Sequence, residues 1–132
     1  MTGVQTCALP ISINVYSDSI SQQMINTIRS AFDSLRYEFD IVDAVCIVDL
    51  PFWKSVAFTL RDNFGWNIIY DCIDYQNRFS NTSEDILQED DLIKNSDLVL
   101  ATSHAMFNEL EKINPNCLLV PNAADEIGRA HV

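Results

Sequence analysis

Four short runs of mostly apolar residues, separated by segments of helical period, most constrain how this chain can fold. The runs are residues 44–48, 67–71, 98–101 and 117–120. Short strands that alternate with helices of about ten residues are typical of α/β proteins with a parallel sheet. We therefore predict a doubly wound, Rossmann-like parallel sheet. The run 44–48 is apolar at every position, which favours a strand buried on both faces.

The helical segments carry recognisable start and stop signals. Apolar residues recur at helical spacing over residues 20–35, after the polar cluster Ser17–Ser19, which we expect to hold the N-cap. A second helix is predicted over residues 53–64, with Gly65 ending it. Further helices are predicted over residues 84–94 and from Ser103 to about residue 113. The acidic residues 84–91 are expected to form a solvated helix face.

The predicted topology locates a candidate binding edge. In open parallel sheets, ligands sit beyond the carboxyl ends of the strands. The residues directly after the four predicted strands are 49–53, 71–75, 102–104 and 121–125. All four groups should open onto the same edge, and three of them carry carboxylates.

Composition and motifs exclude several classes of protein. The chain has 132 residues and a net charge of −11, which suits one domain or part of one and argues against binding to a phosphate backbone. No apolar run is long enough to span a bilayer. Neither a Walker loop, a G-x-G-x-x-G motif nor a metal-spaced Cys/His cluster is present. Ser103 and His104 are adjacent and lack a G-x-S-x-G elbow, so a serine hydrolase is disfavoured. The separated cysteines Cys46, Cys72 and Cys117 are expected to be reduced thiols in a cytosolic protein.

Both ends of the chain read as translated sequencing-adapter DNA. Residues 1–12 can be back-translated as one strand of a common library adapter with GTG as the start codon, and residues 127–132 follow from its reverse complement. We therefore expect residues 1–12 and 126–132 to be artefacts that add nothing to the fold. Residues 13–125 are then the natural segment, and the native termini of the parent lie outside it.

Three motifs in the natural segment resemble those of a known enzyme family. They are Tyr70-Asp-Cys-Ile-Asp74, Asn95-Ser-Asp-Leu-Val-Leu-Ala-Thr-Ser103 and Val120-Pro-Asn-Ala-Ala-Asp125. Together with Pro51-Phe-Trp53 they look like the N-terminal-domain motifs of bacterial GT-B glycosyltransferases of the family 1/family 4 type. The resemblance covers about residues 43–125, and within the acidic run Glu89 matches a glutamate often seen in members of the family. The chain differs from the family pattern at Ala123, where glycine is usual, and by lacking a histidine after the strand that ends near Asp71.

The resemblance implies roles for particular residues. Asp74 would lie at the interdomain cleft and either bind acceptor hydroxyls or take a proton from the attacking oxygen. The residues that would contact substrate are Phe52, Trp53, Tyr75, Ser103, Asn122 and Asp125. All of these residues except Tyr75 have a structural alternative. The alternatives are turn chemistry for Asp74, Asn122 and Asp125, helix capping for Ser103, and a hydrophobic helix start for Phe52 and Trp53.

The parent is accordingly expected to be a cytoplasmic, metal-independent transferase that moves a sugar from a nucleotide donor to a hydroxyl or lipid-linked acceptor. Family habit suggests cell-surface polysaccharide or lipopolysaccharide assembly at the inner face of the bacterial membrane. No cofactor is expected, because the resemblance implies that the nucleotide sugar is a substrate and places its site on a domain absent from this chain. The fragment alone should be inactive and prone to aggregation, since the resemblance implies that a partner of the strand at residues 44–48 is lost.

Two alternative functions remain open. A sugar-nucleotide epimerase or synthase can use the same two-domain fold. A non-catalytic, receiver-like α/β domain would use clustered acids such as Asp49, Asp71 and Asp74, but it would also need a lysine after a late strand. Lys112 comes before the last predicted strand, which disfavours this alternative.

Overall fold

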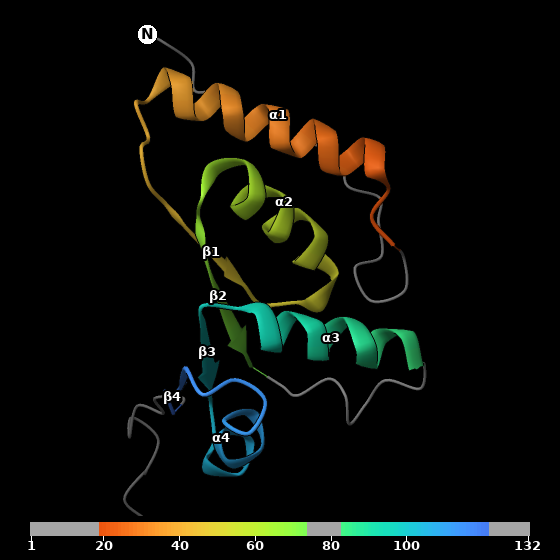
Figure 1. The fold of residues 1–132 in the computed structure, drawn as a ribbon, viewed down its shortest axis with the longest axis vertical. Helices are drawn as coiled ribbons and strands as arrows, with labels where there is room; N and C mark the ends of the chain where they lie inside the picture. Colours follow the sequence, from red (N-terminus) through yellow and green to blue (C-terminus); the bar gives the residue numbers. More distant parts are fainter. Residues whose placement is uncertain (1–18, 74–82, 122–132) are drawn as a thin grey trace, which may run out of the picture.

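The computed structural model describes residues 19–73 and 83–121. The expected adapter-derived segments, residues 1–12 and 126–132, lie outside these ranges. Within them, helices and strands alternate along the chain (Figure 1). In chain order the elements are α1 (Gln22–Glu38), β1 (Val45–Val48), the 3-10 helix η1 (Pro51–Trp53), α2 (Lys54–Phe64), β2 (Asn67–Cys72), α3 (Ser83–Asn95), β3 (Leu98–Ala101), α4 (His104–Leu110) and β4 (Cys117–Leu119).

The strands form one parallel sheet in the order β1-β2-β3-β4. Val48 pairs with Tyr70, Tyr70 with Val99, and Val99 with Cys117, so each strand lies beside the next one in the chain. The predicted Rossmann-like α/β architecture is confirmed. The predicted strands also match the observed ones to within one residue at either end.

Local signals explain where two helices begin and end. The Ser21 hydroxyl accepts a hydrogen bond from the Met24 amide at 3.2 Å and caps α1. The N-cap predicted within Ser17–Ser19 is therefore wrong for Ser19, and the other two residues of that cluster lie outside the described ranges. Gly65 ends α2 as predicted, with φ of 73°, a left-handed conformation that glycine adopts without a Cβ penalty.

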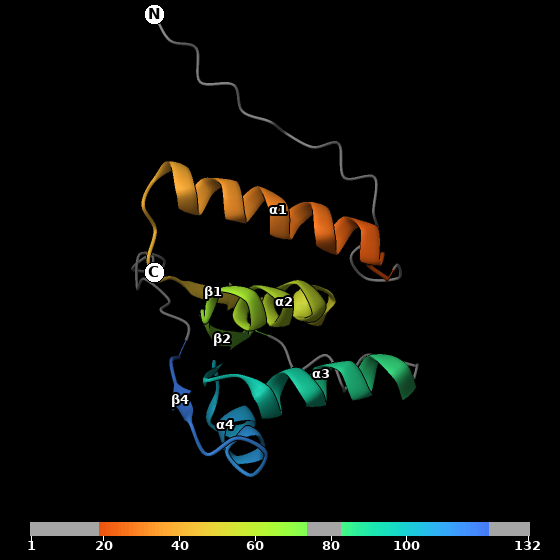
Figure 2. The ribbon, with the colours of Figure 1, turned by 45° about the horizontal axis from the view of Figure 1, so that its top comes forward.

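The main core lies between the sheet and the helices on one of its faces. The strand residues on this face alternate with those on the other, as the pleat requires. The side chains that form this core come from the four strands and from α2, α3 and α4. Its buried members are Val48, Ala57, Ile68, Tyr70, Cys72, Leu92, Ile93, Val99, Ala101 and Leu110. These three helices therefore lie on the same side of the sheet (Figure 2).

A second core cluster joins α1 to α2. Ile25 of α1 packs with Val56 and Leu60 of α2 and with Trp66, whose ring also meets Phe32 edge-on at 5.7 Å. Trp66 follows α2 and leads into β2, so this aromatic contact holds α1 against the helix layer. α1 consequently belongs to the layer that covers the core face of the sheet.

The opposite face of the sheet is open in the described part of the chain. Val45 is 51% exposed, Ile47 66% and Leu118 52%, although all three are apolar strand residues. The expectation that β1 is buried on both faces is thus wrong. The alternating side chains Cys46 and Val48 face the helices, whereas Val45 and Ile47 face outward. An apolar sequence shows that a strand is suited to burial, but it cannot show whether a covering layer is present.

The open face should make the isolated chain self-associate. Exposed apolar sheet surface favours association with other copies. We expect Ile47→Lys to raise the monomer fraction in sedimentation velocity experiments, because a lysine there opposes apolar contact on that face. Val42→Lys is the matched control, since Val42 is 86% exposed but lies outside the sheet. Equal sedimentation of the Ile47→Lys and unsubstituted chains, or an equal effect of Val42→Lys, would contradict this prediction.

Candidate functional site at the carboxyl edge of the sheet

The parallel register brings the ends of all four strands to one edge of the sheet. Cys72 pairs with Ala101, and Ala101 pairs with Leu119, so the segments that follow β2, β3 and β4 leave the sheet side by side. Val48, the last residue of β1, pairs with Tyr70 two residues before the end of β2. The predicted gathering of the strand ends is confirmed for the described residues.

A hydrogen bond ties the end of β3 to the segment after β2. The Thr102 hydroxyl donates to the Ile73 carbonyl at 3.1 Å, across 29 residues of sequence. The Ile73 amide donates in turn to the Asp71 carbonyl at 3.0 Å, which turns the chain as β2 ends. Thr102 therefore fixes the residue directly before Asp74 against the neighbouring strand. No pattern in the sequence marks Thr102 as a positioning residue, because its partner Ile73 lies 29 residues away.

Ser103 caps α4, as its structural alternative predicted. Its hydroxyl accepts a hydrogen bond from the Met106 amide at 3.3 Å, and its carbonyl accepts one from the Phe107 amide at 2.9 Å. Ser103 itself is exposed at the strand-end edge. A hydroxyl that accepts one bond still has its own proton to donate, so capping does not prevent contact with a ligand. His104, the first residue of α4, is exposed as well.

Phe52 and Trp53 lie in η1, directly after β1. Their rings meet edge-on, with centroids 4.9 Å apart. Trp53 also packs against both core clusters, which supports its structural alternative, whereas Phe52 is half-buried. The start of α2 is fastened to α3 by an ion pair of 3.0 Å between Lys54 and Asp91. This ion pair and the Trp53 packing hold η1 at the site edge.

A buried hydrogen bond between β2 and α3 lies in the core beneath the carboxyl edge of the sheet. The Tyr70 hydroxyl donates to Oε1 of Glu89 at 2.7 Å, and Glu89 is 1% exposed. The prediction that the acidic run 84–91 is a solvated helix face is therefore wrong for Glu89. The apolar spacing of α3 offered no sign that one acid turns inward. The sequence feature that could have indicated the burial of Glu89 is Tyr70 in β2, because a tyrosine hydroxyl on the core face needs a hydrogen-bond acceptor.

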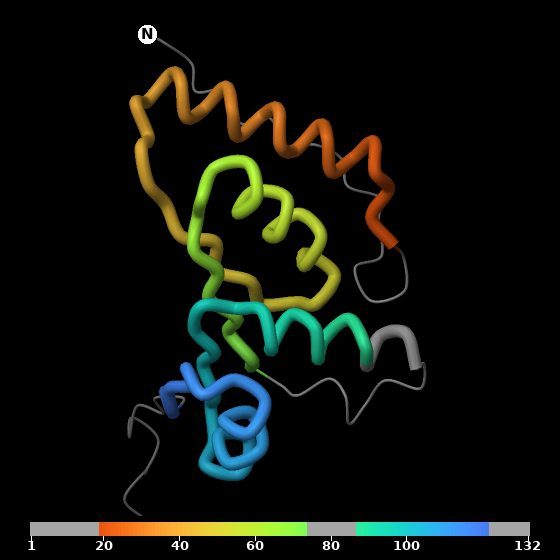
Figure 3. The backbone as a smooth tube through the Cα atoms, viewed as in Figure 1, coloured from red at the N-terminus to blue at the C-terminus, as the bar shows by residue number. Residues whose placement is uncertain are grey.

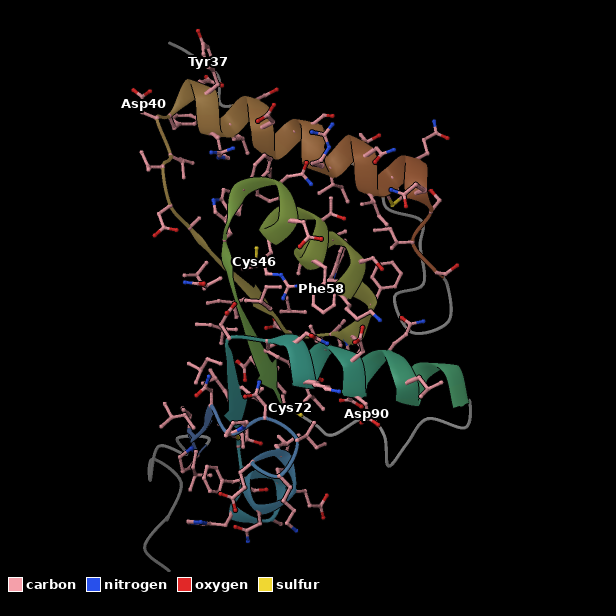
Figure 4. All side chains as sticks on the ribbon, viewed as in Figure 1. Tyr37, Asp40, Cys46, Phe58, Cys72 and Asp90 are labelled. Carbon is pink, nitrogen blue, oxygen red and sulfur yellow. The ribbon has the colours of Figure 1, made fainter. Side chains whose placement is uncertain are left out.

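Burial makes the ionisable groups beside this contact hard to deprotonate. Desolvation is the main cause that raises the pKa of the Tyr70 phenol, and the nearby Cys72 and Glu89 raise it further. Desolvation also raises the pKa of the Cys72 thiol, to about 12. Cys72 lies at the end of β2 next to α3 (Figure 4). Because thiolate is the reactive form, Cys72 is a packing residue and not a nucleophile at neutral pH.

A surface hollow lies away from this edge. It is formed by the last turns of α1 and the segment that leads to the amino end of β1, and its lining residues are Asp33, Arg36, Tyr37, Asp40, Ile41 and Val42. The Arg36 guanidinium stacks over the Phe64 ring at 4.2 Å, which gives this arginine a structural role. Because the hollow lies near the amino end of β1, whereas the candidate site lies at the carboxyl ends of the strands, the hollow is not part of that site.

The structure brings some of the candidate residues together and leaves others undescribed. Phe52, Trp53 and Ser103 follow the carboxyl ends of β1 and β3. Asp71 lies within β2, on the open face of the sheet, beside Leu100. The candidates that lie outside the described residues are Asp74, Tyr75, Asn122 and Asp125.

Comparison with known proteins adds no family assignment. A scan of protein-family models finds no match to the chain, and a search of curated protein sequences finds no significant relative. Among the described residues, no cluster of three or more His, Cys, Asp or Glu side chains is arranged to hold a metal ion. In the same part of the chain, no helix combines the length and the apolar character needed to cross a membrane.

Proposed function

We propose that the chain is the acceptor-side part of a GT-B-type glycosyltransferase, which moves a sugar from a nucleotide donor to a hydroxyl or lipid-linked acceptor. The observation that carries the proposal is the meeting of two family-like motifs at one edge of the sheet. The motif of residues 70–74 begins in the last part of β2, and the motif of residues 95–103 contains β3 and ends at the cap of α4. The bond from Thr102 to Ile73 fastens them together.

The chemistry suits this arrangement. In sugar transfer, the acceptor oxygen forms a bond to the anomeric carbon while the bond from that carbon to the donor phosphate breaks. The acceptor proton must leave the attacking oxygen, and the Asp74 carboxylate is our candidate to receive it. Phe52, beside Trp53 at the same edge, offers an apolar surface for a sugar ring or a lipid tail. Holding the acceptor in place supplies much of the rate enhancement in such a reaction.

The proposal assigns the donor site to a part of the parent enzyme outside this chain. It also assigns the parent to the cytoplasm, at the inner face of the cell membrane, where cell-surface polysaccharide or lipopolysaccharide is assembled. We expect the 132-residue chain to transfer no sugar when it is mixed with labelled nucleotide sugars. A parent that carries this segment should transfer sugar to an acceptor. Epimer formation by the parent without any acceptor would refute the proposal in favour of an epimerase or synthase.

A substitution at Asp74 tests its role within a full-length parent. Asp74→Asn keeps the shape of the side chain but removes the charge and most of its basicity. We expect turnover to fall at least about tenfold, because the proton on the attacking oxygen loses its acceptor. Asp62→Asn is the matched control, since Asp62 is exposed on α2. Unchanged turnover in Asp74→Asn at equal stability would assign Asp74 to turn chemistry.

A further inference from the structure

The carboxyl end of α1 carries a group of exposed apolar side chains, which we call the α1 end patch. Its members are Tyr37, which is 90% exposed, Phe39, which is 64% exposed, and Val42, which is 86% exposed. Tyr37 and Val42 line the same hollow, so they lie close together. Figure 4 shows Tyr37 directed away from α2. Exposed apolar side chains that gather in this way mark interaction sites.

The hollow adds carboxylates to this apolar surface. It has a volume of about 400 Å³, and its lining includes Asp33 and Asp40. The basic side chain among the described lining residues, Arg36, already has contacts. Its guanidinium lies over the Phe64 ring, 4.2 Å from the centroid, and 3.8 Å from Oδ1 of Asp33. The hollow therefore combines apolar surface with an excess of carboxylate, which complements a lysine or arginine and its aliphatic stem.

The turn that ends α1 holds this surface in a fixed shape. Asp40 has a φ of 51°, in the left-handed region, and the Ile41 amide donates to the Arg36 carbonyl at 3.0 Å. This residue conformation and this bond define a Schellman-type helix end. The chain then runs from the turn to the start of β1 (Figure 3). Because the backbone of the patch is already ordered, a partner that binds here orders little more of it.

The acidic residues of this turn are unfavourable for the fold by itself. Glycine adopts the left-handed conformation without strain and is the usual residue at the position of Asp40. The carboxyl end of a helix also has a partial negative charge and favours cations, yet Glu38 and Asp40 lie there. Residues that break local rules of this kind are expected at functional sites. A cation bound at the patch would offset the unfavourable charge.

We propose that the α1 end patch docks a basic segment of another protein. A lysine or arginine of that segment lies in the hollow against Asp33 and Asp40, and an apolar neighbour packs on Tyr37 and Phe39. Aromatic anchors of this kind carry much of the binding energy at protein interfaces. A second copy of this chain is disfavoured, because each copy has a net charge of −11. The patch lies near the amino end of β1, so a bound partner leaves the carboxyl edge of the sheet accessible.

Fluorescence anisotropy with a short labelled peptide of lysine and leucine tests the proposal. The peptide should bind the 132-residue chain, whereas a peptide with glutamate in place of lysine should not. Tyr37→Ala should raise the Kd at least about tenfold through loss of the aromatic anchor. Asp40→Gly should raise the Kd about threefold through loss of one exposed ion pair. Both variants should keep the fold, because Tyr37 is exposed and glycine suits the left-handed turn.

Glu111→Gln is the control for overall charge, because Glu111 is exposed at the end of α4, across the fold from α1 (Figure 1). This variant should leave the Kd unchanged. Equal losses in Glu111→Gln and Asp40→Gly would show that overall charge alone holds the peptide, and would overturn the proposal. Absence of binding by the lysine peptide, equal binding of the glutamate peptide or an unaltered Kd in Tyr37→Ala would overturn it as well. So would a loss of binding confined to Ile47→Lys, since Ile47 lies on the open face of the sheet.

Discussion

Replacing Asn114 by alanine is expected to lower the free energy of unfolding by about 3–5 kcal/mol. The side-chain amide of Asn114 donates to the carbonyls of Ile93 and Ser96, each at 2.8 Å. Its oxygen accepts a bond from the Asn116 amide at 2.9 Å, and the residue is 4% exposed. Alanine would leave the carbonyls of the buried residues Ile93 and Ser96 and the part-buried Asn116 amide without their partner, and each buried orphan costs about 1–3 kcal/mol.

Urea denaturation with matched variants checks this prediction. Asn116→Ala should change the free energy of unfolding by less than about 0.5 kcal/mol, because Asn116 is exposed. Asn114→Asp should destabilise strongly, since it keeps the size of the side chain but removes the donor of two bonds. A loss below about 1 kcal/mol in Asn114→Ala would show that the three groups find other partners.

The bridge made by Asn114 also shows how far sequence reasoning reaches. The helix after Ser103 was predicted to run to about residue 113, whereas α4 ends at Leu110, a few residues before Asn114. The bonds from Asn114 to the end of α3 and to the turn before β3 were not foreseen. They join groups 18 and 21 residues apart, and no local pattern encodes such a contact. Hydrophobic periodicity and turn residues predicted the helices and strands. The role of the Asn114 side chain depends on tertiary contacts, which these local patterns do not encode.

The strands were the most predictable feature. Residues 98–101 were predicted as a strand, and β3 has these bounds. A short apolar run between two capped helices is compatible with few structures other than a buried strand. The α/β architecture could therefore be predicted from the sequence. The exposure of Val45 and Ile47 did not follow, because apolar side chains look the same whether or not a covering layer is present.

The candidate site was predictable as an edge, but less so as a set of contacts. The rule that parallel strand ends gather at one edge correctly grouped the residues after β2 with those after β3. The bond from Thr102 to Ile73 and the inward turn of Glu89 depend on which side chains meet across the fold. The role of Asp74 stays a prediction, because the residue lies outside the described ranges.

The chain is expected to lose stability steeply above pH 9. The folded state raises the pKa of the Cys72 thiol from 9.0 to about 12, chiefly through burial. Between these values the unfolded chain has released a proton that the folded chain still holds, so rising pH favours unfolding. The free energy of unfolding therefore keeps its full value below about pH 9 and falls progressively above it. At pH 11, about two pH units above the unfolded value, the loss from this thiol is about 3 kcal/mol.

Tyr70 steepens this loss above pH 10, because burial also raises its pKa from 10.0. Urea denaturation between pH 8 and pH 11 under reducing conditions measures the combined effect. Cys72→Ala should cost about 1 kcal/mol at pH 8 through lost packing, yet flatten the decline between pH 9 and pH 11. Cys117→Ala should flatten it less, since that thiol is only half-buried. An unchanged slope in Cys72→Ala would mean that Cys72 ionises as readily in the folded chain as in the unfolded one.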